Sequence, residues 1–287
     1  MANDNRKVLA GIDGSAISAA VTDYAAWMAG RVGAPLKLLH NLEHREPVMV
    51  SDLSGNIGLG SREHLLVELS EMEAKRSKIL LEQGKLLLDN ARSRAQSMGI
   101  EEPLLCQRHG SLTETLVELE DEIRVLALGI RGEDHANQPG RLGNQLETVL
   151  RSLHRPILVV NRDFEQPQRI MLAYDGSKAA CRALELLTSS PLFKGMTCHL
   201  VYVGDDADKS KEILQRGAQS LEVSELQVIQ ANLHGIPDQE LLAYQQQHGI
   251  QLQVMGSFGH SRLREMLLGS FTLKMLGQAR VPLLLLR

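Results

Sequence analysis

Short apolar runs alternate along the chain with amphipathic stretches in which apolar residues recur every three to four positions. In the second half, the apolar runs predict strands near residues 169–174, 197–203, 226–231, 252–256 and 283–286. The amphipathic stretches predict helices near residues 177–188, 209–222, 237–248 and 270–279. Such alternation is typical of βαβ units, so the pattern predicts an α/β fold built on parallel sheet.

The first half repeats the same order, which indicates an internal duplication. The matched segments are 7–15 with 169–177, 108–110 with 233–235, 125–132 with 252–259, and 154–160 with 280–286. A repeat period well over a hundred residues long indicates two domains rather than a solenoid. We expect an N-terminal domain over 1–163 and a C-terminal domain over 168–287, joined by a short polar linker.

The first half also carries a long insertion at about 41–98, made of a Gly/Ser-rich loop near 51–61 and a helical run near 62–98. An apolar stripe on this run is expected to be packing surface rather than a ligand site. Its members are Leu65, Leu69, Met72, Ile79, Leu80, Leu87, Ala91 and Ala95. We expect Gly84 to mark a bend in the helix.

Composition is that of an ordinary globular protein, with 43% hydrophobic residues and a net charge of −4. Lys and Arg are dispersed, so no basic face points to nucleic acid. We see neither a signal peptide nor an apolar run long enough to cross a membrane, and expect a cytoplasmic protein. Three cysteines without C-x-x-C spacing fit a reducing compartment as buried thiols. His109 and His234 are expected to be structural or surface residues, and no metal site is predicted.

The pattern Gly256-x-x-Gly259, nine residues, Gly269-Ser270 is the most informative motif. It lies between a predicted buried strand and a predicted helix. Glycines let backbone N–H groups approach a ligand, and a helix N-terminus favours negative charge. The spacing therefore suits a polyphosphate, although a tight turn without a ligand would use the same residues. P-loop and Rossmann patterns are absent, and Ser15 and Ser177 are predicted to be helix N-caps rather than nucleophiles.

The whole chain, over 6–161 and 168–287, resembles the universal stress proteins, specifically the tandem form similar to bacterial E-type members. The glycine motif above carries the resemblance most specifically. It implies a five-stranded parallel sheet of order 3-2-1-4-5 in each domain, with a nucleotide at the carboxyl ends of strands 1 and 4. The implied pseudo-twofold axis would pair the last strands, 157–160 and 283–286. A homodimer is a further expectation.

The resemblance implies an ATP site (or one for ADP or AMP) in the C-terminal domain, with Mg²⁺ held mainly by phosphates and water. Asp175 would contact the adenine or ribose, the glycines would follow the ribose and phosphates, and the helix start would meet the outer phosphates. The implied site residues are Ala173, Tyr174, Asp175, Val203, Met255, Gly256, Gly259, Gly269, Ser270 and Phe271.

The N-terminal copy departs from this pattern. Ten residues rather than nine separate Gly132 from Gly143, and Asn144 replaces the Ser or Thr. Gly129 and Asp13 are retained. We therefore expect the N-terminal site to be degenerate: unoccupied, weak, or adapted to another ligand.

Taken together, the sequence predicts a stress-response protein that binds ATP and acts as a sensor or regulator with an unknown regulatory protein partner. No residue is placed to act as a catalytic base, and none is assigned. Two alternatives stay open. One is a slow nucleotide hydrolase, because fold alone does not separate binders from enzymes. The other is a scaffold or a carrier of apolar small molecules in the N-terminal domain.

Overall fold

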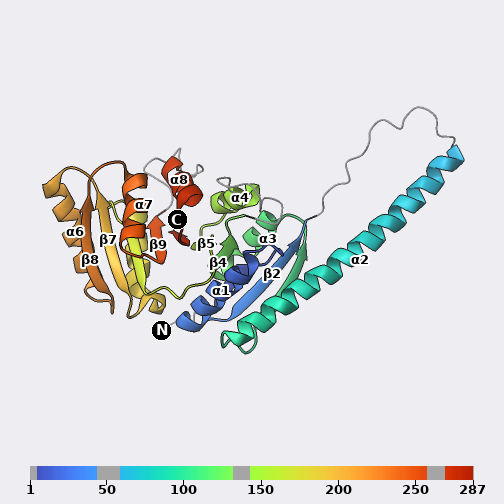
Figure 1. Cartoon of the computed structure of the whole chain (residues 1–287). Coiled ribbons are helices and arrows are strands. Elements are labelled where there is room, and N and C mark those ends of the chain that lie inside the picture. Colours follow the sequence, from blue (N-terminus) through green and yellow to red (C-terminus); the bar gives the residue numbers. More distant parts are fainter. Residues whose placement is uncertain (1–4, 44–58, 132–142, 257–268, 287) are drawn as a thin grey trace.

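In the computed structural model, the chain forms one ten-stranded sheet with helices on both faces (Figure 1). The structure describes residues 5–43, 59–131, 143–256 and 269–286. The N-terminal half contains β1 (Lys7–Gly11), α1 (Ser18–Val32), β2 (Leu36–Leu42), α2 (Leu59–Ser97), β3 (Leu104–His109), α3 (Leu112–Glu118), η1 (Glu120–Glu122), β4 (Ile123–Gly129), α4 (Asn144–Ser152) and β5 (Ile157–Val160). The C-terminal half contains β6 (Arg169–Ala173), α5 (Lys178–Ser189), η3 (Pro191–Phe193), β7 (Thr197–Val203), α6 (Ala207–Leu221), β8 (Gln227–Leu233), α7 (Pro237–Gln247), β9 (Leu252–Gly256), α8 (Ser270–Gln278) and β10 (Leu283–Leu286).

The strand order is β3-β2-β1-β4-β5-β10-β9-β6-β7-β8, which confirms the predicted order 3-2-1-4-5 in each half. Within each half all the pairs are parallel. β5 and β10 pair antiparallel, with Leu283 opposite Val159 and Leu285 opposite Ile157. The predicted pairing of the two last strands is therefore confirmed, and the strands of the two halves run in opposite directions, as a pseudo-twofold axis requires.

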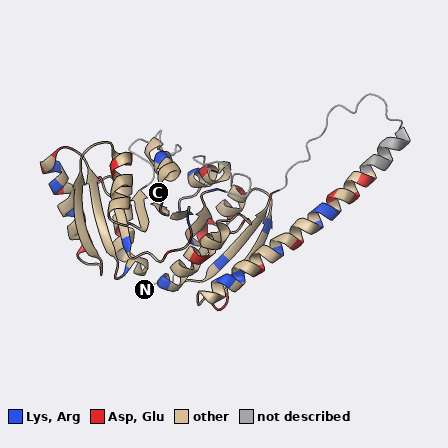
Figure 2. Cartoon of the chain, viewed as in Figure 1, with Lys and Arg blue, Asp and Glu red and all other residues tan. Residues whose placement is uncertain are grey.

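Two hydrophobic cores fill the two faces of the sheet, and each core continues from one half into the other. Helices α1, α2, α5 and α6 pack over one face, and α3, α4, α7 and α8 pack over the other. Charged side chains lie mainly on the helices, and the strands carry few of them (Figure 2). The central strands are buried on both faces, which explains why their sequences are continuous apolar runs.

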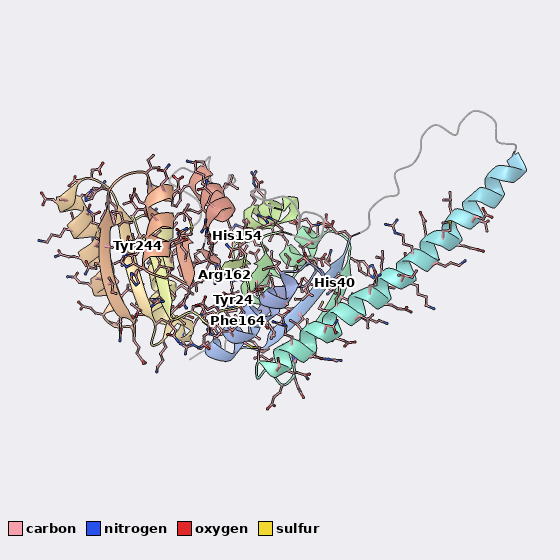
Figure 3. All side chains as sticks on the ribbon, viewed as in Figure 1. Tyr24, His40, His154, Arg162, Phe164 and Tyr244 are labelled. Atoms are coloured by element: carbon pink, nitrogen blue, oxygen red, sulfur yellow. The ribbon has the colours of Figure 1, made fainter. Side chains whose placement is uncertain are left out.

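The linker fixes the two halves against each other. Phe164 packs edge-on against Tyr24 of α1 with ring centroids 4.8 Å apart (Figure 3), and the backbone N–H of Glu165 donates to the Tyr24 hydroxyl at 3.3 Å. Arg31 Nε donates to the Leu192 carbonyl at 3.1 Å. These contacts join α1 to the linker and to η3 of the second half.

Helix α2 is only partly packing surface, which corrects the expectation for its apolar stripe. Its C-terminal part, including Leu88, Ala91 and Ala95, is buried against the sheet and α1. There Arg94 makes a two-point ion pair with the buried Asp23, with both N–O distances 2.6 Å. Farther toward its N-terminus, α2 extends away from the sheet (Figure 1), and Leu69, Met72, Ile79 and Leu80 are exposed. The side chain of Leu65 lies outside the described residues.

Gly84 does not bend this helix, since α2 is continuous over Leu59–Ser97. A Cβ at Gly84 would lie 2.6 Å from Cδ2 of His40 on β2 and 2.2 Å from the Gln107 amide nitrogen on β3. The glycine is needed because the helix crosses the sheet closely at this point.

Two further expectations need correction. Ser177 is the N-cap of α5 and accepts from the Ala180 N–H at 3.2 Å, as predicted. Ser15 caps nothing, because α1 begins later, at Ser18. Of the three cysteines only Cys198 is buried, whereas Cys106 and Cys181 are half-exposed. No helix in the described part of the chain is both long enough and apolar enough to cross a membrane.

Candidate functional site

The carboxyl ends of β6 and β9 form the switch point of the C-terminal half. β6 lies between β7 and β9, and its last residue, Ala173, is paired with Val201 on one side and with Met255 on the other. The chain leaves β6 toward α5 and returns through β7, whereas β9 lies on the opposite side. Open α/β sheets bind their ligands in the crevice that such a reversal creates. Asp175 follows the carboxyl end of β6, and Gly256, the first glycine of the motif, is the last residue of β9.

Asp175 follows β6 and is exposed. Its Oδ1 accepts the backbone N–H of Ser177 at 2.9 Å, which fixes the turn that opens α5. No other described residue makes a hydrogen bond or an ion pair with this carboxylate. One carboxylate oxygen is therefore held for the turn, and the other is available to a ligand hydroxyl or amino group.

Two of the expected site residues turn their side chains away from the crevice. Tyr174 is buried beneath α6, with its hydroxyl 3.6 Å from Cys181 Sγ, and burial followed by this hydrogen bond raises its pKa to about 12. Met255 is buried in the core on the other face. Only the backbone of these two residues is placed at the strand ends. Ala173 and Val203 are half-buried at the same ends of β6 and β7.

Gly256 ends β9 where α5 comes close. A Cβ at this position would lie 2.5 Å from the carbonyl carbon of Ala179 and 2.7 Å from its Cβ. Packing alone therefore requires a glycine here, because no side chain fits between β9 and the first turn of α5. Gly259, the second glycine of the motif, lies outside the described residues.

Helix α8 begins at Ser270 with Gly269 as its N-cap, and no side chain caps it. The N–H of Leu273 donates to the Gly269 carbonyl at 3.1 Å, so the N–H groups of the three preceding residues have no partner within the helix. No acidic residue stands in this first turn. Ser270 is exposed, whereas Phe271 is half-buried against the core and holds the helix in place. The helix start thus presents backbone donors and a hydroxyl, a combination that suits an anion.

In the N-terminal copy, the equivalent carboxylate makes more hydrogen bonds within its own turn. Oδ1 of Asp13 accepts three hydrogen bonds, from the Ser15 N–H at 3.0 Å and from the hydroxyls of Ser15 and Ser18 at 2.6 Å each. A Cβ at Gly129 would lie 2.5 Å from Cγ2 of Ile17, which occupies the position that Ala179 has in the other half. Gly143 is the N-cap of α4, as Gly269 is of α8, and Gly132 lies outside the described residues.

Ile17 and Ala179 were not among the predicted site residues, although the duplication aligns them. Their effect depends on a close approach between α1 or α5 and the neighbouring strand, which the repeat alone does not show. Within the described segments, no three His, Cys, Asp or Glu side chains gather closely enough to hold a metal ion.

Comparison with known proteins agrees with this architecture. The profile of the Universal stress protein family matches residues 4–161 and 167–287. A universal stress protein of Synechocystis sp. is 32% identical over 98% of this chain and 100% of its own length. The crystal structure of a universal stress protein from Archaeoglobus fulgidus covers 99% of this chain and 96% of its own, with a TM-score of 0.69 and 21% identity. A structure from Arabidopsis thaliana with AMP bound, also of this family, covers 42% of this chain and 91% of its own, with a TM-score of 0.34 and 14% identity. The chain belongs to the universal stress protein family and carries two of its domains in tandem.

Proposed function

We propose that the C-terminal domain binds an adenine nucleotide, ATP or else ADP or AMP, and that its occupancy regulates the protein rather than supporting fast catalysis. The observation that carries the proposal is the difference between the two strand-end carboxylates. Oδ1 of Asp13 accepts three hydrogen bonds within its own turn and this side chain is half-buried, whereas Asp175 accepts one and is exposed. Both copies carry the same Asp-Gly-Ser sequence, and the carboxylate of the C-terminal copy is the more exposed of the two.

Asp175 and two neighbouring features fit the parts of a nucleotide. The carboxylate accepts hydrogen bonds and therefore suits a ribose hydroxyl or the adenine amino group. The backbone at Val203 ends the adjacent strand and would lie against the base. The N-terminus of α8 would receive the phosphates, because its amides lack helical partners and no acidic side chain opposes the charge. Mg²⁺ would be held by the phosphates and water.

Nucleotide binding can supply enough free energy to change the stability of the domain. A ligand present at a hundredfold excess over its Kd stabilises the folded protein by about 2.7 kcal/mol. That is a large fraction of a typical domain stability of about 5–15 kcal/mol. In this proposal the protein works in the cytoplasm, and the nucleotide-bound state is what an unknown regulatory partner recognises.

The test is isothermal titration calorimetry with MgATP on the wild type and on a matched pair of variants, Asp175→Ala and Asp13→Ala. We expect one site per chain, a loss of at least tenfold in affinity for Asp175→Ala, and no change for Asp13→Ala. Thermal unfolding checks that both variants fold. No binding at millimolar MgATP, two sites per chain, or equal effects of the two substitutions would each reject the proposal.

We also propose that two copies of the chain dimerise through the extended part of α2. Met72, Ile79 and Leu86 recur every seven residues along one side of the helix and are 68%, 55% and 64% exposed. With Leu69, Arg76 and Gln83 they follow the alternating three- and four-residue spacing of a coiled-coil seam. Leu88 and Ala95, which pack on the sheet, lie on the opposite side of the helix.

The charged residues beside the seam indicate that its partner is a second copy of this chain. When two α2 seams lie antiparallel with Arg76 of one copy beside Ile79 of the other, Lys75 of each copy flanks Glu82 of the other. In a parallel pair, Arg76 of one copy would instead face Arg76 of the other, and Glu68 of one copy would flank Glu73 of the other. The antiparallel arrangement therefore gives two attractive pairs at the centre of the seam.

Analytical ultracentrifugation tests this interface. We expect a dimer for the wild type, a monomer for Met72→Asp and weakened association for Lys75→Glu. The double charge exchange Lys75→Glu with Glu82→Lys should restore the dimer, since it only reverses the pairs. Ser77→Asp, an exposed position off the seam, serves as the control and should remain a dimer. A monomeric wild type, or no rescue by the exchange, would reject the interface.

A further inference from the structure

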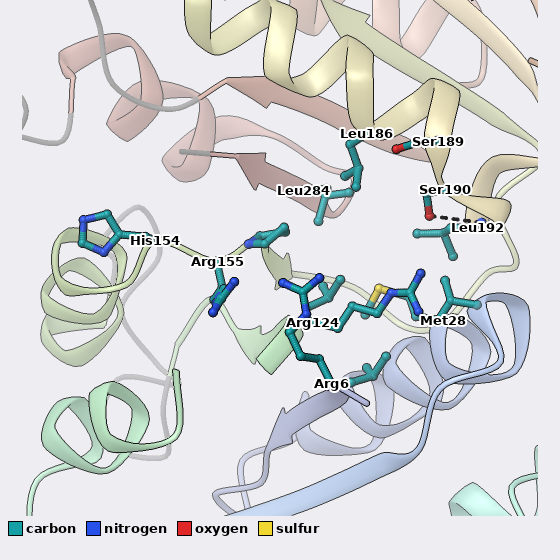
Figure 4. Close-up of a pocket in the computed structure, with 14 residues that line it drawn as sticks. Arg6, Met28, Arg124, His154, Arg155, Leu186, Ser189, Ser190, Leu192 and Leu284 are labelled. Carbon is teal, nitrogen blue, oxygen red and sulfur yellow. Dashed lines mark hydrogen bonds between the residues drawn. The ribbon is translucent and has the colours of Figure 1, made fainter. Parts of the chain in front are cut away.

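A cavity of about 330 Å³ lies between the two domains and shares no residue with the nucleotide site (Figure 4). The N-terminal domain contributes residues at the amino ends of β1, β4 and β5 and on α1. The C-terminal domain contributes the end of α5, the turn after it and β10. The linker contacts hold α1 against the second domain and so fix the two sides of the cavity relative to each other.

The charged residues that line the cavity are all cationic or, for His154, can become so. Arg6, Arg124, His154 and Arg155 line the cavity, and no Asp or Glu lies among its lining residues. Figure 4 shows the three arginine side chains on the side of the N-terminal domain, facing Leu186, Ser189 and Ser190 of the other domain. Each arginine is only partly exposed. Like charges gathered in a half-buried space are costly unless an anion compensates them.

Some nearby carboxylates pair with lysines outside the cavity, and others pair with cations of the cavity itself, including Glu120, whose Oε1 lies 3.5 Å from His154 Nδ1. Glu122 makes ion pairs with Lys7 at 2.8 Å and with Lys37 at 2.7 Å. Asp121 and the Glu120 carbonyl hold Arg155 in place, with its Nη2 3.1 Å from Asp121 and its Nε 2.9 Å from that carbonyl. No hydrogen bond or ion pair joins Arg124 to any described residue. The guanidinium of Arg124 therefore lines the cavity without a protein counter-ion among the described segments.

The rest of the wall is apolar and includes two hydroxyl groups. Val8, Met28, Leu192 and Leu284 are buried residues that line it, and Leu192 and Leu284 come from the second domain. The Ser189 hydroxyl donates to the Glu185 carbonyl at 2.7 Å, whereas Ser190 Oγ accepts the Leu192 N–H at 3.3 Å and can donate its own proton to a ligand. A guanidinium offers a planar fork of donors that matches phosphate and carboxylate oxygens. The volume lies at the small end of the range for ligand pockets.

We propose that this interdomain cavity binds a small organic anion, one with a phosphate or carboxylate head on Arg124 and its neighbouring arginines and an apolar body against the leucines. Because both domains supply walls, the bound anion stabilises the contact between them. The site is distinct from the nucleotide site, so the two ligands bind the same chain at the same time.

Calorimetry with two probes tests the site: phenyl phosphate and benzoate, with neutral benzyl alcohol as the control ligand. We expect one anion per chain in the wild type and no binding of benzyl alcohol. Arg124→Met should weaken anion binding at least tenfold, and Arg124→Lys should weaken it less. Arg182→Met, the same change at an exposed position of α5 outside the cavity, should leave binding unchanged. Saturating MgATP should not displace the probe.

The comparison of the two probes identifies the head group, since a phosphate site prefers phenyl phosphate and a carboxylate site prefers benzoate. Thermal unfolding of each variant confirms that it folds. The proposal is overturned if neither anion binds the wild type at millimolar concentration, if Arg182→Met weakens binding as much as Arg124→Met, or if MgATP competes with the probe. That last outcome would assign the binding to the nucleotide site.

Discussion

Ile17 and Ala179 occupy the same place in the two domains, beside the glycine that ends the fourth strand of each, but only Ile17 brings a branched side chain to it. A Cβ on Gly129 would lie 2.5 Å from Cγ2 of Ile17, whereas Gly256 meets the backbone of Ala179 and a single methyl group. The strand end is thus covered by a larger apolar group in the N-terminal domain than in the C-terminal one.

Ala179→Ile should therefore weaken nucleotide binding by at least tenfold, because it introduces into the C-terminal site the bulk that covers the N-terminal one. The reciprocal change, Ile17→Ala, should leave the affinity of the C-terminal site unchanged. Calorimetry with MgATP measures both variants, and the unfolding temperature shows whether either has lost its fold. Equal affinity for Ala179→Ile and the wild type, with both folded, would mean that the nucleotide does not pass this position.

Gly84→Ala should destabilise the protein by about 1–3 kcal/mol, because the added methyl group meets the buried His40 ring and the Gln107 amide. Helix propensity alone would give the opposite sign, with alanine better by about 1 kcal/mol. Gly30→Ala is a matched control within α1, where nothing lies within 4 Å of an added Cβ. That variant should be neutral or slightly more stable. Denaturant midpoints compare the two, and a stabilising Gly84→Ala would contradict the close crossing of α2.

Glu122→Gln should lower stability at neutral pH by less than about 1 kcal/mol, because the ion pairs that it removes are partly exposed. Hydrogen bonds from Lys37 and then Lys7 lower the pKa of Glu122 from 4.5 to about 2. A lowered pKa gives stability that is complete above pH 4.5 and is lost as the pH falls toward 2.

Thermal unfolding of the wild type and of Glu122→Gln at several pH values, in low salt, checks this. The difference between them should be constant near neutrality and should shrink below pH 4.5. A difference that grew on acidification would show that the carboxylate is not the group involved. High salt should reduce the difference at pH 7.

Cys198 should be inert toward thiol reagents in the native protein, because burial raises its pKa to about 12 and reagents attack the thiolate. Cys106 and Cys181 are half-exposed and should react. We expect two reactive thiols per native chain and three after unfolding in guanidinium. Cys198→Ala should give two under both conditions, and three rapidly reacting thiols in the native wild type would contradict the assigned burial.

Much of the fold could be predicted from the sequence, because buried strands in a doubly wound sheet leave a strong local signal. Strands β7, β9 and β10 were predicted with the boundaries that the structure has, and β6 to within one residue. The duplication and the apolar last strands also led to the β5–β10 pairing. The family resemblance supplied the strand order.

The candidate site was less predictable, since similar sequences acquire different roles from their neighbours. Asp-Gly-Ser occurs in both domains, yet Ser177 caps α5 while Ser15 donates to Asp13. The difference begins with Ser18, whose hydroxyl also bonds Asp13, whereas the aligned residue in the other copy is Ala180. Tyr174 was expected at the ligand edge, but its ring fills the space that Gly217 of α6 leaves.

By itself the sequence determined which segments are strands and helices, that the chain is built twice, and that Asp175 and Gly256 lie at strand ends. Periodicity encodes these features because each depends on residues close together in the chain. Only the tertiary structure decided which half of the α2 stripe is buried, that Ile17 covers one strand end, and that arginines from three strand starts meet serines of the other domain. These features depend on how elements approach one another, and a local pattern gives the face of a helix but not what covers it.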